Sequence, residues 1–147
     1  MNFFLTGIFF LALTACARPD YLSVDPRQQN HTQDQCALIF SKNSLCANVH
    51  WSQGPQTPAE SEFILKFWNS KNATENGPYN DPAQNPSVVL WMPSMGHGSS
   101  PVKVEKLETG VYRIKRVYFI MSGEWEVRIS LKNADGSSEQ QTLSLVL

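Results

Sequence analysis

The sequence has 147 residues, of which 41% are hydrophobic and 11% aromatic, and its formal net charge is -1. This length and composition fit one globular domain with a modest tail and exclude a wholly disordered chain. The 12 basic and 13 acidic residues include no basic cluster larger than the pair Lys115 and Arg116. Nucleic acid is therefore not expected as a partner.

Residues 1–15 are almost wholly apolar and uncharged, which is too short for a comfortable transmembrane helix but suits a signal peptide. No Lys or Arg stands before the apolar run, so only the amino-terminal amine supplies the positive end that is expected of an export signal. The letters LTAC at 13–16 resemble the lipobox of bacterial lipoproteins, in which the cysteine is acylated after cleavage. We expect Cys16 to anchor the protein on a membrane, facing the periplasm. The residue after the cysteine is Ala17 rather than the Asp that is associated with inner-membrane retention, and this favours the outer membrane. The alternative is a buried amino-terminal strand or helix.

The lipidated cysteine and a flexible tether are expected over residues 16–35, because that stretch is polar, contains two prolines and shows no sustained period. The folded domain then covers 36–147. It holds the two other cysteines, Cys36 and Cys46, which predict a disulfide in an oxidising compartment. A thiolate metal site is the alternative, although nine intervening residues differ from the short spacing of zinc and redox sites.

Short apolar runs separated by turn residues predict an all-β domain. The alternation of apolar and polar residues in 62–68 and 125–131 lets one face of each strand be buried. About seven strands at this spacing favour an immunoglobulin-like antiparallel β-sandwich. The expected strands cover residues 45–51, 62–68, 88–92, 102–107, 111–121, 125–131 and 141–146.

The strand expected at 111–121 changes phase in its middle. Tyr112 and Ile114 fit one face, whereas Val117, Phe119 and Met121 fit the other. A β-bulge near Lys115, or a change of sheet, would bring both sets to the same side.

Residues 69–86 form a long insertion rich in Asn, Pro and Gly. Loops of this length are often functional or disordered. Since the insertion holds no cluster of carboxylates or histidines, we expect a solvated surface loop.

The stretch WMPSMGHGSS at 91–100 places two thioethers and an imidazole in six positions. Met92, Met95 and His97 suit a soft metal, because thioether sulfur prefers Cu(I) whereas zinc is usually held by thiolates, imidazoles or carboxylates. Gly96 and Gly98 flank the histidine and allow the chain to turn back on itself. The stretch therefore predicts a copper-binding loop, and a purely structural loop remains the alternative.

Two further residues could add ligands to this loop. Met121 could contribute a third thioether if its strand lies beside the loop, although a methionine at a strand end also serves as a core residue. His50 is a more distant candidate. Ser94, Ser99 and Ser100 lie too close in sequence to His97 for a base and nucleophile pair, and no G-x-S-x-G motif or phosphate loop is present. An enzyme is therefore not expected.

The stretch WMPSMGHGSSPV followed by GVYRIKRVYFIMSGEWEVRISL resembles the YtkA-like and FixH-like family of small envelope β-sandwich domains. Such proteins are commonly associated with copper handling or with assembly of copper-dependent respiratory oxidases. The resemblance implies that Met92, Met95 and His97 bind the metal, with Met121 in the strand that follows. FixH-like proteins often carry a transmembrane anchor, and the lipid expected here departs from that pattern. The departure weakens the case for a role inside an oxidase assembly complex.

These features together favour a membrane-anchored periplasmic module that binds Cu(I) and buffers or delivers it, with a copper acceptor as partner. A second hypothesis is an envelope interaction domain that binds a partner protein without metal. In that case Trp91, Met92, Pro93 and Met95 would form an apolar contact surface, since aromatic residues and Met are enriched in interface cores.

Overall fold

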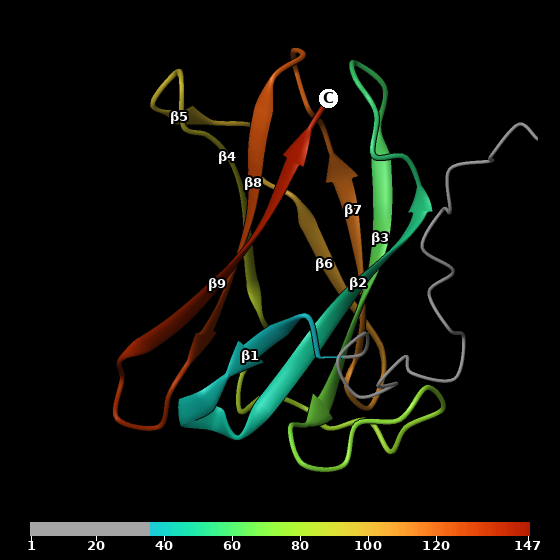
Figure 1. The fold of residues 1–147 in the computed structure, drawn as a ribbon, viewed down its shortest axis with the longest axis vertical. Helices are drawn as coiled ribbons and strands as arrows, with labels where there is room; N and C mark the ends of the chain where they lie inside the picture. The colour runs from blue at the N-terminus through green and yellow to red at the C-terminus, as the bar shows by residue number, and fades with distance from the viewer. Residues whose placement is uncertain (1–35) are drawn as a thin grey trace, which may run out of the picture.

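The structure is a computed structural model that describes residues 36–147, and it shows two antiparallel sheets packed face to face (Figure 1). The five-stranded sheet has the order β1-β2-β3-β7-β6, and the four-stranded sheet has the order β5-β4-β8-β9. The predicted antiparallel β-sandwich is confirmed. The elements are β1 (Leu38–Phe40), the 3-10 helix η1 (Ser41–Asn43), β2 (Leu45–Gln53), β3 (Ser61–Asn69), β4 (Ser87–Met92), β5 (His97–Gly98), β6 (Lys103–Glu108), β7 (Val111–Val117), β8 (Glu124–Lys132) and β9 (Ser138–Val146).

Alternate side chains of the strands fill the space between the sheets. The residues of β3 and β8 that face inward are fully buried: Phe63, Leu65, Phe67, Val127 and Ile129. Burial of each such side chain contributes about 1.5–3 kcal/mol. The period-two pattern of the sequence therefore defines both inner faces of the sandwich, as expected for strands with one buried side.

The predicted change of phase in β7 is a β-bulge. Val117 pairs with Ser61 of β3, but the next pair joins Ile114 to Phe63, so β7 contains one extra residue. Arg116 takes a left-handed backbone conformation, with φ at 58°. Tyr112 and Ile114 before the bulge and Val117 and Phe119 after it are therefore all buried.

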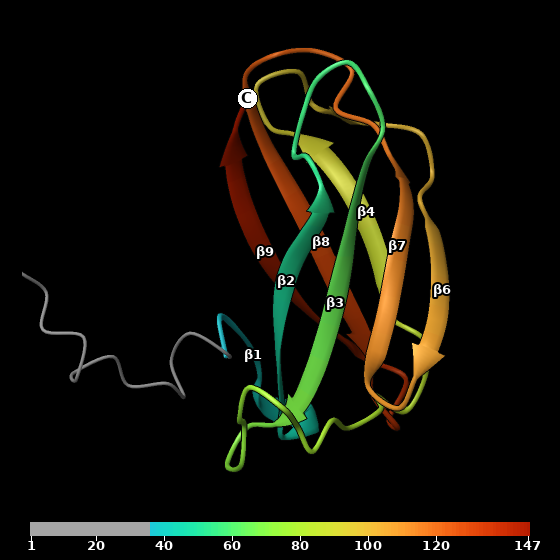
Figure 2. The same ribbon diagram turned by 90° about the vertical axis from the view of Figure 1, so that its right-hand side faces the viewer.

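The structure has nine strands rather than about seven, and one expected strand is too long. The two additional strands, β1 and β5, have only three and two residues, too few for a hydrophobic period to be read. The strand expected at 111–121 ends at Val117, because after the bulge the chain leaves the five-stranded sheet and crosses to β8 in the other one. Met121 therefore lies in the connection between β7 and β8. Figure 2 shows this connection passing from one sheet to the other.

The predicted disulfide between Cys36 and Cys46 is present, with the two Cα atoms 5.0 Å apart. Cys46 packs with Trp68 and Ala73 in a small cluster separate from the main core. The disulfide thus ties the start of the described chain to β2 and β3.

The insertion at 69–86 is more than the solvated loop we expected, because several of its residues are packed against the sandwich. The ring of Tyr79 meets that of Trp68 edge to face, with centroids 5.3 Å apart. The indole N–H of Trp68 donates to the carbonyl of Thr74 at 2.7 Å, and Ala73 is buried. This packing was not visible in the sequence, since it depends on an aromatic residue of β3.

Asp81 fastens the end of this insertion to the turn between β6 and β7. Its carboxylate accepts hydrogen bonds from Lys106 at 2.6 Å, from the Gly110 N–H at 2.7 Å and from the Tyr112 hydroxyl at 3.0 Å. These donors, Lys106 first, lower the pKa of Asp81. The fold gains stability from this shift above the ordinary carboxyl pKa and loses it as the pH falls through the lowered value. Burial, followed by the Asp81 contact, raises the pKa of Tyr112 to about 12.

The signal peptide expected at 1–15, the lipidated Cys16 and the tether expected up to residue 35 lie outside the described residues. Within residues 36–147, no helix is both long enough and apolar enough to cross a membrane.

We predict that Gly110→Ala destabilises the fold by about 2–5 kcal/mol, which combines the strain of a left-handed alanine with overpacking. Gly110 has φ at 65°, and an added Cβ would lie 2.6 Å from the backbone nitrogen of Asn80. Gly136 has φ at 81° but nothing within 4 Å of that position. Gly136→Ala should therefore cost only the strain, about 1–2 kcal/mol. Denaturant unfolding of both variants measures the difference, and equal losses would contradict the close packing at Gly110.

Candidate functional site

The stretch that holds Met92, Met95 and His97 is a β-hairpin rather than an irregular loop. Met92, the last residue of β4, pairs with His97, the first residue of β5. The N–H groups of Met95 and Gly96 both donate to the Met92 carbonyl, at 3.2 and 3.0 Å. Gly96 has φ at 67°, which glycine adopts without strain. Residues 92 and 97 are therefore neighbours across the hairpin.

Gly98 lets the second strand of the hairpin lie close to the first. A Cβ on Gly98 would come within 2.7 Å of the Leu90 carbonyl oxygen. On the outer face of β4, the guanidinium of Arg128 lies 4.6 Å from the centre of the Trp91 ring and forms an ion pair with Glu126 at 2.7 Å. These contacts support the base of the hairpin.

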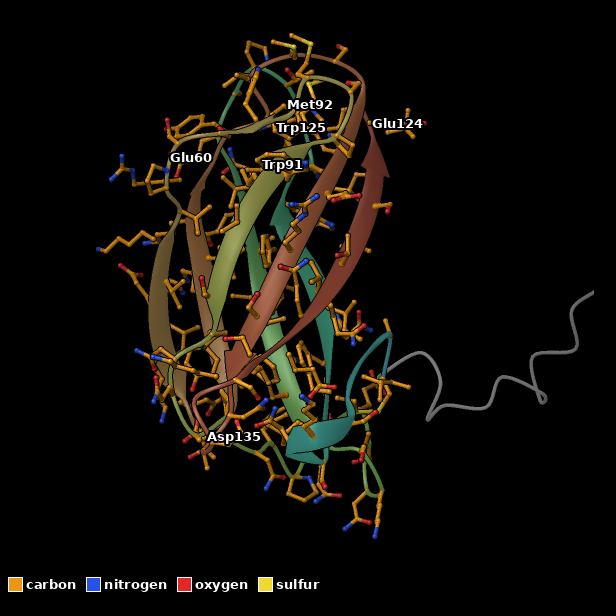
Figure 3. The ribbon with its side chains drawn as sticks, turned by 90° about the vertical axis from the view of Figure 1, so that its left-hand side faces the viewer. Glu60, Trp91, Met92, Glu124, Trp125 and Asp135 are labelled. Atoms are coloured by element: carbon orange, nitrogen blue, oxygen red, sulfur yellow. A yellow bond between two sulfur atoms is a disulfide. The ribbon has the colours of Figure 1, made fainter. Side chains whose placement is uncertain are left out.

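Met92 is a core residue whose terminal methyl group reaches the connection between β7 and β8. Only 4% of Met92 is exposed, and it belongs to the main hydrophobic cluster together with Trp125. Its Cε atom would be 2.7 Å from a Cβ on Gly123, so that position accepts no side chain without displacing the thioether. Figure 3 shows Met92 near Trp125 at one end of the sandwich, with Asp135 at the opposite end.

Met121 lies two residues before Gly123, outside any strand, and 38% of it is exposed. The Met121 carbonyl accepts a hydrogen bond from the Trp125 indole N–H at 2.9 Å. Earlier in the same connection, the Tyr118 carbonyl accepts one from the hydroxyl of Ser99, directly after β5, at 2.6 Å. The hairpin and the connection that carries Met121 are thus linked by a direct hydrogen bond.

Met95 and His97 face solvent. Met95, in the turn of the hairpin, is 54% exposed. The Nδ1 atom of His97 lies 3.2 Å from the Gly98 carbonyl oxygen, and Nε2 has no hydrogen-bond partner among the described residues. Both side chains therefore present donor atoms at the surface.

The structure brings all four predicted ligands to one end of the sandwich but exposes them unequally. Met95, His97 and Met121 are exposed, and Met92 lies behind them. No three His, Cys, Asp or Glu side chains of residues 36–147 gather closely enough to hold a metal ion. A metal at this end would therefore depend on thioether sulfur, the ligand type that selects Cu(I).

His50 lies in the other sheet, on β2, where it pairs with Ile64 of β3. Burial and the charge of Lys66 lower its pKa. A nearby ammonium group that disfavours the imidazolium also disfavours a bound cation.

Sequence reasoning did not identify Glu60, Tyr118 and Ser99 as residues that hold this end of the sandwich in place. Glu60 accepts hydrogen bonds from the Arg116 N–H at 2.7 Å and from the Tyr118 hydroxyl at 2.9 Å, and Ser99 bonds to Tyr118 as described above. Glu60 and Tyr118 are 58 positions apart in sequence, and no local pattern signals such a pair. The phase change in β7 could have marked Arg116 as a place where an N–H is free for another partner.

Residues 70–130 match the sequence model of a family described as YtkA-like. This part of the chain is a YtkA-like domain. The predicted resemblance is thereby confirmed for the YtkA-like family, and its FixH-like part stays a prediction. No curated protein and no solved structure matches the chain. The YtkA-like range runs from the insertion after β3 into β8 and includes all four predicted ligands.

Truncation of the methionines in the YtkA-like hairpin should separate the core residue from the exposed one. We predict that Met92→Ala costs about 2–5 kcal/mol of stability, as for other buried methionines. Met95→Ala should change stability by less than about 0.5 kcal/mol, because its side chain is exposed and has little to lose. Denaturant unfolding without added metal measures both changes, and a comparable loss for Met95→Ala would contradict its exposed position.

Proposed function

We propose that this protein is a membrane-anchored module of the bacterial cell envelope that binds Cu(I) in the periplasm and buffers or delivers it. One observation carries the proposal: Met95, His97 and Met121 are exposed on two chain segments that the bond from Ser99 to Tyr118 links directly. In this role the protein is a binding module rather than an enzyme.

The choice of metal follows from the donor atoms. Two exposed thioethers and one imidazole form a soft set, which Cu(I) accepts and which Mg²⁺ or Ca²⁺ would refuse. Met92 is the inner member of the set. The Cε atom of Met92 reaches Gly123, and the Met92 sulfur is bonded to that atom. The sulfur therefore approaches the connection between β7 and β8, which carries Met121, from the core side.

Anchoring rests on the apolar segment at 1–15 and on Cys16. The disulfide between Cys36 and Cys46 supports export, because disulfides persist in oxidising compartments such as the periplasm. Two or more acyl chains hold a domain on a membrane without a spanning helix. Mass spectrometry of the protein from bacterial membranes should find an acylated amino-terminal Cys16, and an unmodified, uncleaved chain would refute the anchor.

A second candidate function, an interaction domain without metal, draws support from a cavity beside the hairpin. This cavity of about 280 Å³ is lined in part by Pro93, Glu124, Ser144 and Val146. Val146 is 80% exposed, so the cavity has an apolar rim that a partner protein could cover. This function predicts no Cu(I) binding in the titration that follows.

We predict that the mature chain, expressed from residue 17 without a tag, binds one Cu(I) in competition with a chromophoric Cu(I) chelator. Combined replacement of the exposed donors by Met95→Leu, His97→Ala and Met121→Leu should weaken binding by at least about 100-fold, since loss of outer partners alone costs about 10–100-fold.

Met92→Leu is the matched variant, because it keeps the core volume but removes the third sulfur of the four candidate donors. A further loss of affinity in this variant shows that Met92 ligates, and an unchanged affinity limits the site to the three exposed donors. An unchanged affinity in the triple variant would overturn the site.

A further inference from the structure

The connection between β7 and β8 carries Met121, yet residues 118–121 lie outside the strands. Regular strands are held by ladders of backbone hydrogen bonds, and this segment has no such ladder. Its position depends instead on the fully buried ring of Phe119, which meets that of Trp125 edge to face, and on a few hydrogen bonds that involve side chains. Tyr118 takes part in two of these hydrogen bonds, one through its side-chain hydroxyl and one through its backbone carbonyl.

The hydroxyl of Tyr118 donates to one carboxylate oxygen of Glu60 at 2.9 Å, and the Arg116 N–H donates to the other at 2.7 Å. The bulge explains the second bond. Arg116 is the extra residue with a left-handed backbone, so its N–H turns away from the ladder and needs another acceptor. Glu60 thus clamps the chain where it leaves β7.

The carbonyl of Tyr118 accepts a hydrogen bond from the Ser99 hydroxyl at 2.6 Å. Ser99 directly follows the hairpin, and its own N–H donates to the Leu90 carbonyl of β4 at 3.1 Å. Tyr118 therefore joins the hairpin with Met95 and His97 to the segment that ends in Met121.

We propose that Tyr118, held by Glu60 and Ser99, is a positioning residue that keeps Met121 beside the hairpin ligands. This inference rests on the proposed copper site for its functional meaning, but it also makes a claim about the metal-free protein. Tyr118 itself contributes no ligand. It acts by placing Met121, which stands three residues further along the chain.

The opposite end of β7 offers a matched control. There Asp81 accepts hydrogen bonds from the Gly110 N–H at 2.7 Å and from the Tyr112 hydroxyl at 3.0 Å. Glu60 is bonded in the same way, because in both cases one carboxylate binds a backbone N–H and the hydroxyl of the tyrosine two residues later. This second clamp lies at the turn between β6 and β7, away from the hairpin (Figure 1). Tyr112→Phe therefore removes a similar hydrogen bond without touching the candidate site.

The experiment compares Tyr118→Phe and Ser99→Ala with Tyr112→Phe in the mature chain. Two quantities are measured: Cu(I) affinity by chelator competition, and the NMR resonance of the Met121 methyl group in metal-free protein labelled at methionine methyls. We expect Tyr118→Phe and Ser99→Ala each to weaken Cu(I) binding by about fivefold, the equivalent of one typical hydrogen bond. Both should shift or broaden the Met121 resonance, and Tyr112→Phe should change neither quantity.

Equal effects of Tyr118→Phe and Tyr112→Phe on both quantities would overturn the positioning role, because a general loss of stability would explain them. If the unaltered protein binds no Cu(I), the proposed function fails on its own. The Met121 resonance then decides the inference: a change confined to Tyr118→Phe and Ser99→Ala upholds it, and no change refutes it.

Discussion

The bulge at Arg116 in β7 is the constraint on which the rest of the structure depends. A strand without it would bury Tyr112 and Ile114 but turn Val117 and Phe119 to the solvent, since side chains alternate between faces. The extra residue brings both pairs into one core. It also frees the Arg116 N–H for Glu60 at the point where the chain crosses to the second sheet.

The two ends of the sandwich use similar chemistry for different purposes. At one end, Asp81 joins the insertion at 69–86 to the turn before β7, in a region with no candidate ligand. At the other end, Glu60 holds the connection that carries Met121. Met121 therefore lies on a connection that the buried Phe119 and a few hydrogen bonds to side chains hold in place, whereas Met95 and His97 lie on a hairpin held by backbone hydrogen bonds.

Much of the fold could be predicted because hydrophobic alternation acts over neighbouring residues. All seven expected strands exist, and the phase change in β7 indicated its bulge. The short strands β1 and β5 could not be predicted, since two or three residues show no period and these strands exist only through pairing with β2 and β4. The sequence predicted which residues form the candidate site but not which of them are exposed. The burial of Met92 depends on Gly123, which lies opposite its terminal methyl group and is far from it in sequence.

The sequence by itself determined the all-β class, the disulfide partners, the YtkA-like stretch and the residue types that could bind a soft metal. Those properties follow from residue type, spacing and alternation, which act locally along the chain. Only the tertiary structure decided that Met92 lies in the core, that Met95 and Met121 are exposed, and that Tyr118 links their segments. The physical reason is that burial and the contacts among Glu60, Tyr118 and Ser99 join residues far apart in sequence, and they arise only when the two sheets pack together.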